Sequence, residues 1–388
     1  MSGRRANNEG TIYWDQKLKR FIGQFSYTDA AGKVKRKKIT GKKKSEVLTA
    51  GQRFLRELEE LLEQQGTVTT GSYVQKWLIN VVKPNVRVKT FDRYDCAFRR
   101  QIQPHIGHIP LQHLSRQNLQ DFLNTLKNKG STEGKPLSAR TVNATRRLLK
   151  TALDMAVADG MITTNPVDLT KPFKVEHTKM QIFTPEEYSR LLAAAKGYSR
   201  NAYLVIRIAF ATGFRIGEIF GLEYNAVDPV NSTITVKQTV ISTNNGKRLQ
   251  PMAKNVSSIR TIKVDDDFIN ELQKYKDEHF SRKQLLKNKY EQEHDFIIEN
   301  EFGDFCDPSY FTDKIFKKKL LPAAGLPSTF RMHDCRHTHA TWLISRGVNI
   351  KAVSQRLGHK SIRTTLDIYS HVTASMQDEA VEALKDVL

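Results

Sequence analysis

Apolar residues near the N-terminus are spaced first as in strands and then as in a helix. The segments GTIYWDQ, RFIGQFSYTD and KVKRKKITG alternate or cluster β-forming residues between turn signals, which predicts three short strands. Ser45 is a suitable N-cap for the amphipathic helix that follows. Its predicted apolar positions are Leu48, Leu55, Leu58 and Leu62. The polar segment QQGTVTTGS, around residues 64–72, then predicts a domain boundary.

Helical spacing dominates the next hundred residues. Four segments show it: SYVQKWLINVV, KTFDRYDCAFRRQI, SRQNLQDFLNTLKN and SARTVNATRRLLKTALDMAVADG. The last helix begins at Ser138 and has a cationic side opposite its apolar side, and the prolines of TTNPVDLTKPFK end it. The cationic residues are Arg140, Arg146, Arg147 and Lys150. A helical bundle with one basic face suits packing on a duplex, held by phosphate contacts more than by base reading.

The pattern changes again from about residue 180. Thr184, Pro185 and Glu187 form an N-cap, a first helical position and a capping box, and the apolar helix NAYLVIRIAFATG ends at Gly213. The segments STITVKQTVIST, KRLQPMA and SIRTIKV predict a β-meander, HDFIIEN a strand, and the remainder is chiefly helical. The chain is therefore predicted to be an α+β multidomain protein. Its parts would be a small three-stranded sheet with a helix, an all-α domain, and a mainly α domain with a small antiparallel sheet.

Charge points to a polyanionic partner. The 388 residues include 62 Lys and Arg against 41 Asp and Glu, a net charge of +21. Residues 1–178 hold most of this excess, with 32 basic and 16 acidic residues. Nucleic acid is the simplest partner for such a chain, and the alternative is a basic surface that serves solubility.

The densest basic run is KVKRKKITGKKK, in which eight of twelve residues are cationic. These residues are Lys33, Lys35, Arg36, Lys37, Lys38, Lys42, Lys43 and Lys44. A sheet this small cannot bury eight cations, so they are expected to face outward. We favour a DNA-binding ribbon over a solvated basic tail, because the run lies within strand-like sequence.

The cysteines and the apolar stretches bear on the compartment. Cys96, Cys306 and Cys335 are an odd, scattered trio that forms no disulfide framework and fits a reducing cytosol. The start MSGRRANNEG lacks the apolar core of a signal peptide, and no stretch approaches the ~18 apolar residues of a membrane helix. We therefore expect a cytoplasmic protein, associated with the nucleoid when bound to DNA.

The stretch HDCRHTHA is the first candidate for chemistry. His333 and His337 have the i, i+4 spacing of a zincin helix, with Asp334 in the position of the glutamate. However, Arg336 lies between them, and a fixed cation is unfavourable beside a divalent metal. His333 and Arg336, at i and i+3, would instead share a helical face and suit phosphate oxygens. From this stretch alone zinc, phosphate binding and buried structural histidines all remain open.

Two other segments contain candidate residues. Arg215, in ATGFRIGEIFGL, is flanked by apolar sequence, so it either pairs with a carboxylate such as Glu218 or binds an anion in a cleft. RLGHKSIRTTLDIYSHV contains His359 and, ten residues later, Tyr369. Most tyrosines are ordinary surface residues. A nucleophilic phenol has a reference pKa near 10 and needs proton acceptors and neighbouring positive charge.

Taken in order, these motifs resemble the tyrosine recombinases of the lambda-integrase class, specifically phage and conjugative-transposon integrases. The resemblance rests on ATGFRIGEI, a lysine before SIRTIKV, and HDCRHTHATWLISRGVNIKAVSQRLGHKSIRTTLDIYSH, and it covers about residues 180–375. It implies an arm-type DNA-binding domain over residues 1–66, a helical core-binding, SAM-like domain over 67–172 and a catalytic domain over 173–388.

The resemblance also assigns catalytic roles. Arg215 and Arg336 match the two arginines that clamp the scissile phosphate, and Glu218 matches a supporting carboxylate. Lys254 matches the general acid for the 5′-oxygen leaving group, and Tyr369 matches the nucleophile that forms a 3′-phosphotyrosyl bond.

His333 and His359 match the two histidines that contact the phosphate or assist proton transfer. Cys335, His337 and His339 become structural candidates, and no metal or other cofactor is implied.

The function expected from this resemblance is site-specific recombination that integrates and excises a mobile element. The expected partners are double-stranded DNA at specific sites and further copies of the chain in a tetramer, with an accessory directionality factor left open. The C-terminal helix TASMQDEAVEALKDVL would pack on its own domain or, as the resemblance implies, dock on a neighbouring protomer. The alternatives are a type IB topoisomerase-like nicking-closing enzyme and a catalytically silent DNA-binding regulator.

Overall fold

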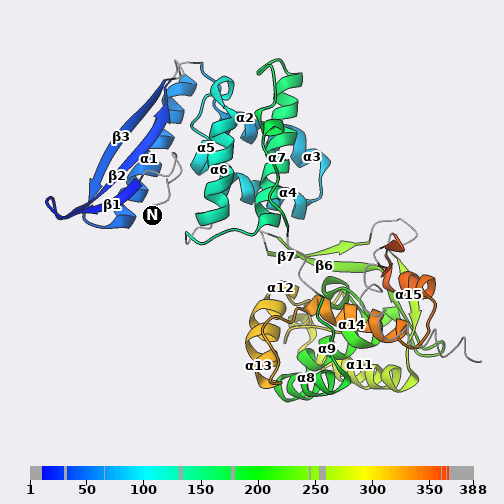
Figure 1. Ribbon diagram of the computed structural model, residues 1–388. Coiled ribbons are helices and arrows are strands. Elements are labelled where there is room, and N and C mark those ends of the chain that lie inside the picture. The colour runs from blue at the N-terminus through cyan, green and yellow to red at the C-terminus, as the bar shows by residue number, and fades with distance from the viewer. Residues whose placement is uncertain are drawn as a thin grey trace, which may run out of the picture. The chain divides into compact units, whose positions relative to one another are not determined.

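The protein forms two compact units, Met1–His177 and Thr178–Leu388. The computed structural model describes residues 11–29, 33–64, 66–130, 134–175, 180–243, 246–252, 259–359, 361–363 and 365–366. Figure 1 shows the helices and strands of both units, which we describe separately.

The first unit begins with the predicted three strands and helix. The strands are β1 (Thr11–Asp15), β2 (Arg20–Thr28) and β3 (Val34–Gly41), and α1 (Lys44–Gln64) follows. They pair antiparallel in the order β1-β2-β3. Ser45 is not the N-cap, because the helix already begins at Lys44. The Glu46 carboxylate instead accepts hydrogen bonds from the backbone amides of Lys42 (3.0 Å) and Lys43 (3.2 Å).

The buried side of α1 differs from the predicted leucine stripe. Leu55 and Leu62 are buried, but Leu48 is 44% exposed and Val47 is fully buried instead. Gly51 explains the offset, since a Cβ atom there would lie 2.0 Å from the Phe25 ring. The ring of β2 occupies the space beside this glycine, so the helix presents positions 47, 51 and 55 to the sheet.

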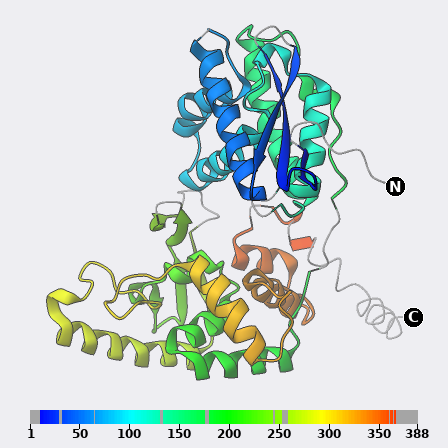
Figure 2. The same cartoon turned by 90° about the vertical axis from the view of Figure 1, so that its left-hand side faces the viewer.

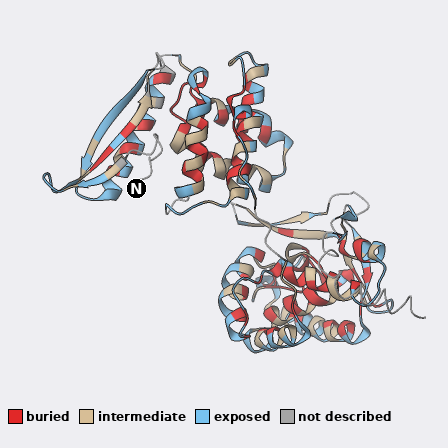
Figure 3. Ribbon diagram, in the orientation of Figure 1, coloured by how far each residue is buried: buried red, intermediate tan, exposed pale blue. Residues whose placement is uncertain are grey.

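The rest of the first unit is a helical bundle, as predicted. Its α-helices are α2 (Thr70–Trp77), α3 (Lys83–Asn85), α4 (Val88–Ala97), α5 (Gln103–Ile106), α6 (Arg116–Lys129) and α7 (Ala139–Ala158). Its 3-10 or π-helical segments are η1 (Leu78–Val82), η2 (Phe98–Ile102), η3 (Leu111–His113) and η4 (Pro166–Leu169). Ser138 caps α7 by accepting a hydrogen bond from the Thr141 amide, which confirms the predicted start. One apolar core lies between these helices, whose buried residues are red in Figure 3.

The second unit is mainly helical and contains two small sheets. Its α-helices are α8 (Pro185–Tyr198), α9 (Arg200–Thr212), α10 (Ile216–Phe220), α11 (Asp266–Leu286), α12 (Pro308–Tyr310), α13 (Leu321–Ala323), α14 (Met332–Ile344) and α15 (Ile350–Leu357). Its 3-10 or π-helical segments are η5 (Tyr224–Ala226), η6 (Lys287–Lys289) and η7 (Phe311–Leu320). Figure 2 shows this unit from a second side. The predicted capping box of Thr184 and Glu187 is present, and α9 ends at Gly213 with a left-handed backbone, φ +66°.

The strands of the second unit are paired differently from the predicted meander. They are β4 (Val227–Asp228), β5 (Thr233–Val236), β6 (Gln238–Thr243), β7 (Gly246–Pro251) and β8 (Arg260–Lys263). β6 and β7 form a separate hairpin, and β8 returns to pair with β5, in the order β4-β5-β8. The meander prediction was therefore wrong, because local sequence reveals strands but not which distant strand completes each ladder.

The predicted strand HDFIIEN was also wrong. This segment makes only isolated bridges, Glu223 to Phe296 and Glu299 to Phe305. Phe296, Ile297 and Ile298 are all buried, so protein covers the segment on every side, and such a run resembles a strand in sequence. With these corrections the fold class is confirmed as a mixture of a small N-terminal sheet, a helical bundle and a mainly helical second unit. None of the described helices is long and apolar enough to cross a membrane.

Candidate active site

Three segments that are distant in sequence meet at Arg336 in the second unit. Arg336 lies on α14 and is 2% exposed. Its Nη1 donates a hydrogen bond to the carbonyl oxygen of Gly213 at 2.7 Å, and its Nη2 donates to that of Leu357 at 2.6 Å. One guanidinium therefore joins the end of α9 to the end of α15.

Helix termini explain why these carbonyls attract an arginine. The last carbonyls of an α-helix lack an intrahelical partner and form its negative pole. Both α9 and α15 end at a glycine with φ +66°, Gly213 and Gly358. A Cβ atom on Gly213 would lie 2.7 Å from both His339 and Leu357, so only glycine fits this crossing.

Arg215 is held by a buried carboxylate. It stands at the N-cap of α10, and its Nη1 donates to Oε1 of Glu218 at 2.7 Å while Nη2 donates to the Gly358 carbonyl at 3.3 Å. The backbone amide of Arg215 donates to the other carboxylate oxygen at 2.9 Å. The Arg215 side chain remains 43% exposed, whereas that of Glu218 is 2% exposed. The predicted ion pair is therefore present, and the exposed guanidinium can still meet an anion.

Positive charge exceeds negative charge around Glu218. Burial alone would raise the pKa of Glu218, but hydrogen bonds and charges from Arg260 and Arg215 outweigh it and hold the pKa below its usual value. Burial, followed by the Arg215 charge, lowers the pKa of Arg336 to about 9, which still leaves it cationic at pH 7. In the described part of the chain no ion pair joins Arg336 to a carboxylate. Three guanidinium groups thus surround one carboxylate, an arrangement that favours an anionic ligand.

His333 lies on the exposed face of α14, on the same helix as Arg336. Its ring centroid is 4.5 Å from that of His337. The surrounding protein desolvates the ring although the residue as a whole is exposed, and this effect, followed by the His337 and Arg336 charges, lowers the pKa of His333 to about 4. The imidazole is therefore neutral at pH 7 in the free protein and can offer one N–H donor.

His359 directly follows the glycine that ends α15. Its Nδ1 shares a 2.8 Å hydrogen bond with the hydroxyl of Thr365. Thr365 is fully buried, so this bond fixes the orientation of the His359 ring. Burial, followed by the Arg336 and Arg215 charges, lowers the pKa of His359 to about 4. A phosphate would add negative charge beside these histidines and raise both pKa values, because opposite charge favours the protonated ring.

The structure thus brings together four of the residues predicted for catalysis and the carboxylate predicted to support them. They are Arg215, Glu218, His333, Arg336 and His359. Two others, Lys254 and Tyr369, lie outside the described residues, as does the C-terminal segment predicted to dock on a neighbour.

Two other side chains of HDCRHTHA, Cys335 and His339, pack inside the unit. Cys335 is fully buried in the apolar core. Nδ1 of His339 is 2.7 Å from the Phe210 carbonyl oxygen, and its Nε2 is 3.1 Å from Nε of Arg356. Among the described residues, no group of three or more His, Cys, Asp and Glu side chains could hold a metal ion.

Sequence reasoning assigned no role to Arg260 and Arg356. Arg260 contacts Glu218 directly, and Arg356 donates to the backbone carbonyls of Lys263 and Ala211 as well as to His339. The only sequence signal for Arg260 was its place next to the lysine motif, in SIRTIKV. Because its partner is 42 residues away, spacing alone could not reveal the pair.

The predicted DNA-binding cations of β3 are exposed but not equivalent. Lys35 pairs with Asp29 at 3.0 Å, and Nζ of Lys37 lies 5.7 Å from the centre of the Phe54 ring of α1. Side chains alternate between the two faces of a strand, so Arg36 and Lys38 lie on the face away from α1. This second face is available to a large partner.

Two of the predicted cations on α7 have internal partners. Arg146 donates to the Thr170 hydroxyl (2.8 Å) and to the carbonyls of Thr170 (2.7 Å) and Val167 (3.1 Å), which fastens the segment after the helix. Lys150 forms salt bridges with Asp168 (2.5 Å) and Asp154 (3.2 Å). Arg140 and Arg147 are exposed on the same helix. These contacts give Arg146 a role in holding the bundle together.

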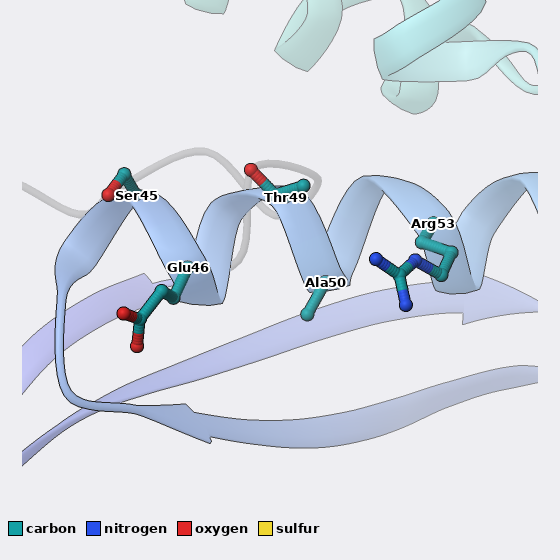
Figure 4. Close-up of a pocket in the computed structure, with 5 residues that line it drawn as sticks. All are labelled: Ser45, Glu46, Thr49, Ala50 and Arg53. Atoms are coloured by element: carbon teal, nitrogen blue, oxygen red, sulfur yellow. The ribbon is translucent and has the colours of Figure 1, made fainter.

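Five residues of α1 line a pocket beside the N-terminal sheet, as Figure 4 shows. They are Ser45, Glu46, Thr49, Ala50 and Arg53. Glu46 is bonded to the amides that precede the helix, and four of the five residues are exposed on the helix surface. This pocket has none of the convergent groups found around Arg336.

Comparison with known proteins decides the family. The phage integrase family matches residues 181–376, and the N-terminal SAM-like domain of phage integrases matches residues 69–127. The chain belongs to the phage integrase family. It is a tyrosine recombinase, an enzyme of site-specific DNA recombination, and the predicted recombinase function is confirmed.

Relatives with these names extend over most of the chain. A tyrosine recombinase XerC-like protein of Caldanaerobacter subterraneus subsp. tengcongensis is 30% identical, with 92% of this chain and 94% of that protein covered. The ICEBs1 integrase of Bacillus subtilis is 25% identical, with 79% of each covered. These names agree with a recombinase and give no support to the topoisomerase or regulator alternatives.

Solved structures share the fold. The Tn1549 transposon integrase in complex with a circular intermediate DNA has a TM-score of 0.67 at 23% identity, covering 82% of this chain and all of that chain. A lambda integrase tetramer bound to a Holliday junction has a TM-score of 0.55 at 18% identity, covering 95% and 96%. The integrase fold therefore includes both units of this chain.

Proposed function

We propose that this integrase breaks and rejoins DNA at the cluster around Arg336, with Tyr369 as the nucleophile. The observation that supports this most strongly is a buried arginine bonded only to carbonyl oxygens in the described structure, beside a second arginine and two neutral histidines. The protein does not neutralise all of the positive charge at such a site, so the site favours an anionic ligand. A scissile phosphate would provide that negative charge.

Charge accounting supports phosphoryl transfer. Arg215, Arg260 and Arg336 surround the single carboxylate of Glu218, which leaves an excess of two positive charges among these four groups. A phosphodiester has one negative charge, and more develops on its non-bridging oxygens as the nucleophile attacks in line. Guanidinium groups fixed before the reaction stabilise that charge without reorganising.

The remaining steps use proton transfers. Tyr369 would attack the phosphorus and pass its proton to a neutral imidazole of the site, His333 or His359. The bond between phosphorus and the 5′-oxygen would break, and Lys254 would protonate that oxygen. His333 and His359 would donate hydrogen bonds to the phosphate. The 3′-phosphotyrosine conserves the bond energy, so a free 5′-hydroxyl of another strand reverses the reaction without ATP.

The wider assembly follows from the same assignment. We propose an arm-type DNA-binding domain at residues 1–66, a core-binding domain at 67–172 and a catalytic domain at 173–388, acting on double-stranded DNA at specific sites. Four copies would assemble on DNA through C-terminal helix exchange, to integrate and excise a mobile element. The protein would act in the cytoplasm, on the nucleoid, with any directionality factor as a separate partner.

A strand-exchange assay tests the proposed function. Purified protein and two DNA molecules with the recombination sites are expected to yield recombinant products, at equal rates with EDTA or Mg²⁺, because arginines and a lysine fill the roles of a metal. Relaxation of supercoiled DNA without recombinants would instead indicate a nicking-closing enzyme. Activity abolished by EDTA and restored by zinc would overturn the metal-free mechanism.

The exposed face of β3 gives a second prediction. The double variant Arg36→Gln/Lys38→Gln is expected to weaken DNA binding and to reduce the slope of log K against log[salt] by about 1.8, since each phosphate contact contributes about 0.9. Lys35→Gln/Lys37→Gln removes the same charge from the face toward α1 and serves as the matched control. Titrations of labelled DNA at several salt concentrations measure both slopes. Equal changes in the two variants would refute a specific DNA-binding face.

A further inference from the structure

Arg260, the first residue of β8, contacts both Glu218 and the backbone at the end of α15. Its side chain is 7% exposed. Nη2 and Nη1 donate to the two carboxylate oxygens of Glu218, at 2.7 and 3.3 Å, and Nε donates to the Arg356 carbonyl oxygen at 2.9 Å. Its guanidinium stacks on the Phe214 ring, 4.8 Å from the ring centre. The protein therefore contacts all three guanidinium nitrogens and one face of this group.

Through these contacts Arg260 connects the groups that hold the two arginines proposed to bind the phosphate, Arg215 and Arg336. Glu218 binds the Arg215 guanidinium through one oxygen and the Arg260 guanidinium through both. The Arg356 carbonyl is one residue before Leu357, whose carbonyl accepts from Arg336. Arg260 also packs against the backbone of Gly358, where a Cβ atom would approach it to 3.1 Å. A shift of Arg260 would therefore disturb the orientation of Arg215 and the end of α15 together.

We propose that Arg260 is a positioning residue for the cleavage reaction, which fixes Arg215 through Glu218 and fixes the Leu357–His359 turn through its backbone. This inference rests on the proposed function of the site. Because the Arg260 side chain is 7% exposed and its three guanidinium nitrogens all donate to the protein, we infer that it acts through Glu218 and the turn and not by contacting DNA.

Loss of Arg260 has a consequence that depends on pH. The charged groups near Glu218 are Arg215 on α10, Arg260 on β8 and Arg336 on α14, and the titratable ring of His359 lies beside these arginines. Burial raises the pKa of Glu218, and the hydrogen bonds and charge of Arg260 are the main effects that lower it. Without Arg260 the pKa of Glu218 rises, and a protonated Glu218 no longer holds Arg215 by charge. The cleavage rate of the variant relative to wild type is therefore expected to fall as pH decreases.

Single-turnover cleavage of a nicked suicide substrate at pH 6 to 9 tests this role. Arg260→Gln is expected to lower the rate about 10- to 100-fold, as for other residues that orient ligating groups, with the larger loss at low pH and with DNA affinity unchanged. Arg260→Lys should recover part of the rate, because it restores the charge beside Glu218. In Glu218→Gln/Arg260→Gln the extra pH dependence should disappear, because the titrating carboxylate is gone.

Arg207→Gln is the matched control. Arg207 also pairs with a carboxylate, Glu271 at 3.7 Å, and stacks on a ring, Phe268 at 4.9 Å, but it belongs to α9 and α11 packing. Thermal melting of both variants separates destabilisation from positioning. If Arg260→Gln loses activity only in proportion to stability, or with no pH dependence, Arg260 is structural. If wild type forms no covalent adduct, the proposed function fails, and the positioning role of Arg260 in cleavage fails with it.

Discussion

Replacing Arg336 with lysine is expected to lower the rate of strand cleavage about 10²- to 10³-fold, the usual cost of removing one preorganised donor of a transition-state oxyanion. Lysine keeps one ionisable nitrogen at this position, and the burial that lowers the pKa of Arg336 to about 9 also lowers the pKa of a lysine there. What is lost is the planar fork that binds the Gly213 and Leu357 carbonyls at 2.7 and 2.6 Å. Lysine presents a single ammonium, which cannot span both carbonyls and a phosphate.

The Arg336→Lys variant is also expected to be less stable, because a buried carbonyl is left without its partner at a cost of about 1–3 kcal/mol. Arg346→Lys is the control, since Arg346 follows the same helix and its Nη1 donates to the Trp342 carbonyl at 3.1 Å from an exposed position. Single-turnover cleavage at a temperature where both variants are folded separates catalysis from stability. An Arg336→Lys rate within threefold of wild type would contradict the clamp.

Local patterns in the sequence predicted much of the fold. The starts of α7 and α8 and the end of α9 were predicted correctly, because a capping side chain or a left-handed glycine acts within a few residues. The face of α1 was not, because the Phe25 ring against Gly51 sets it from another strand. The pairing of β8 with β5 likewise joins residues far apart in the sequence, and local sequence patterns do not predict it.

In the candidate site, too, contacts between residues close in sequence could be predicted and contacts between distant residues could not. Arg215 and Glu218 are three residues apart, and their ion pair was among the predicted alternatives. The burial of Arg336 between two helix ends could not be predicted, because it depends on the crossing of α9 and α15 at Gly213 and Leu357. Charge count also does not distinguish a cation free for DNA from one used internally, as Arg146 demonstrates.

Tyr369→Phe is expected to abolish covalent chemistry completely while leaving DNA binding intact. The change removes only the hydroxyl that attacks phosphorus, and no other group in the proposed mechanism can replace it. Tyr310→Phe is the matched control, because Tyr310 is a 61% exposed tyrosine of the same unit. Equal affinity of both variants for the recombination site would show that the loss is chemical.

The most direct test is to trap and map the protein–DNA adduct. Wild-type protein on a nicked suicide substrate should give a covalent complex stable in denaturant, with a free 5′-hydroxyl and a 3′-phosphate bonded to the peptide that contains Tyr369. Tyr310→Phe should give the same complex and Tyr369→Phe none. An adduct on a different residue, or one that persists in Tyr369→Phe, would contradict the assignment of this site as a tyrosine recombinase centre.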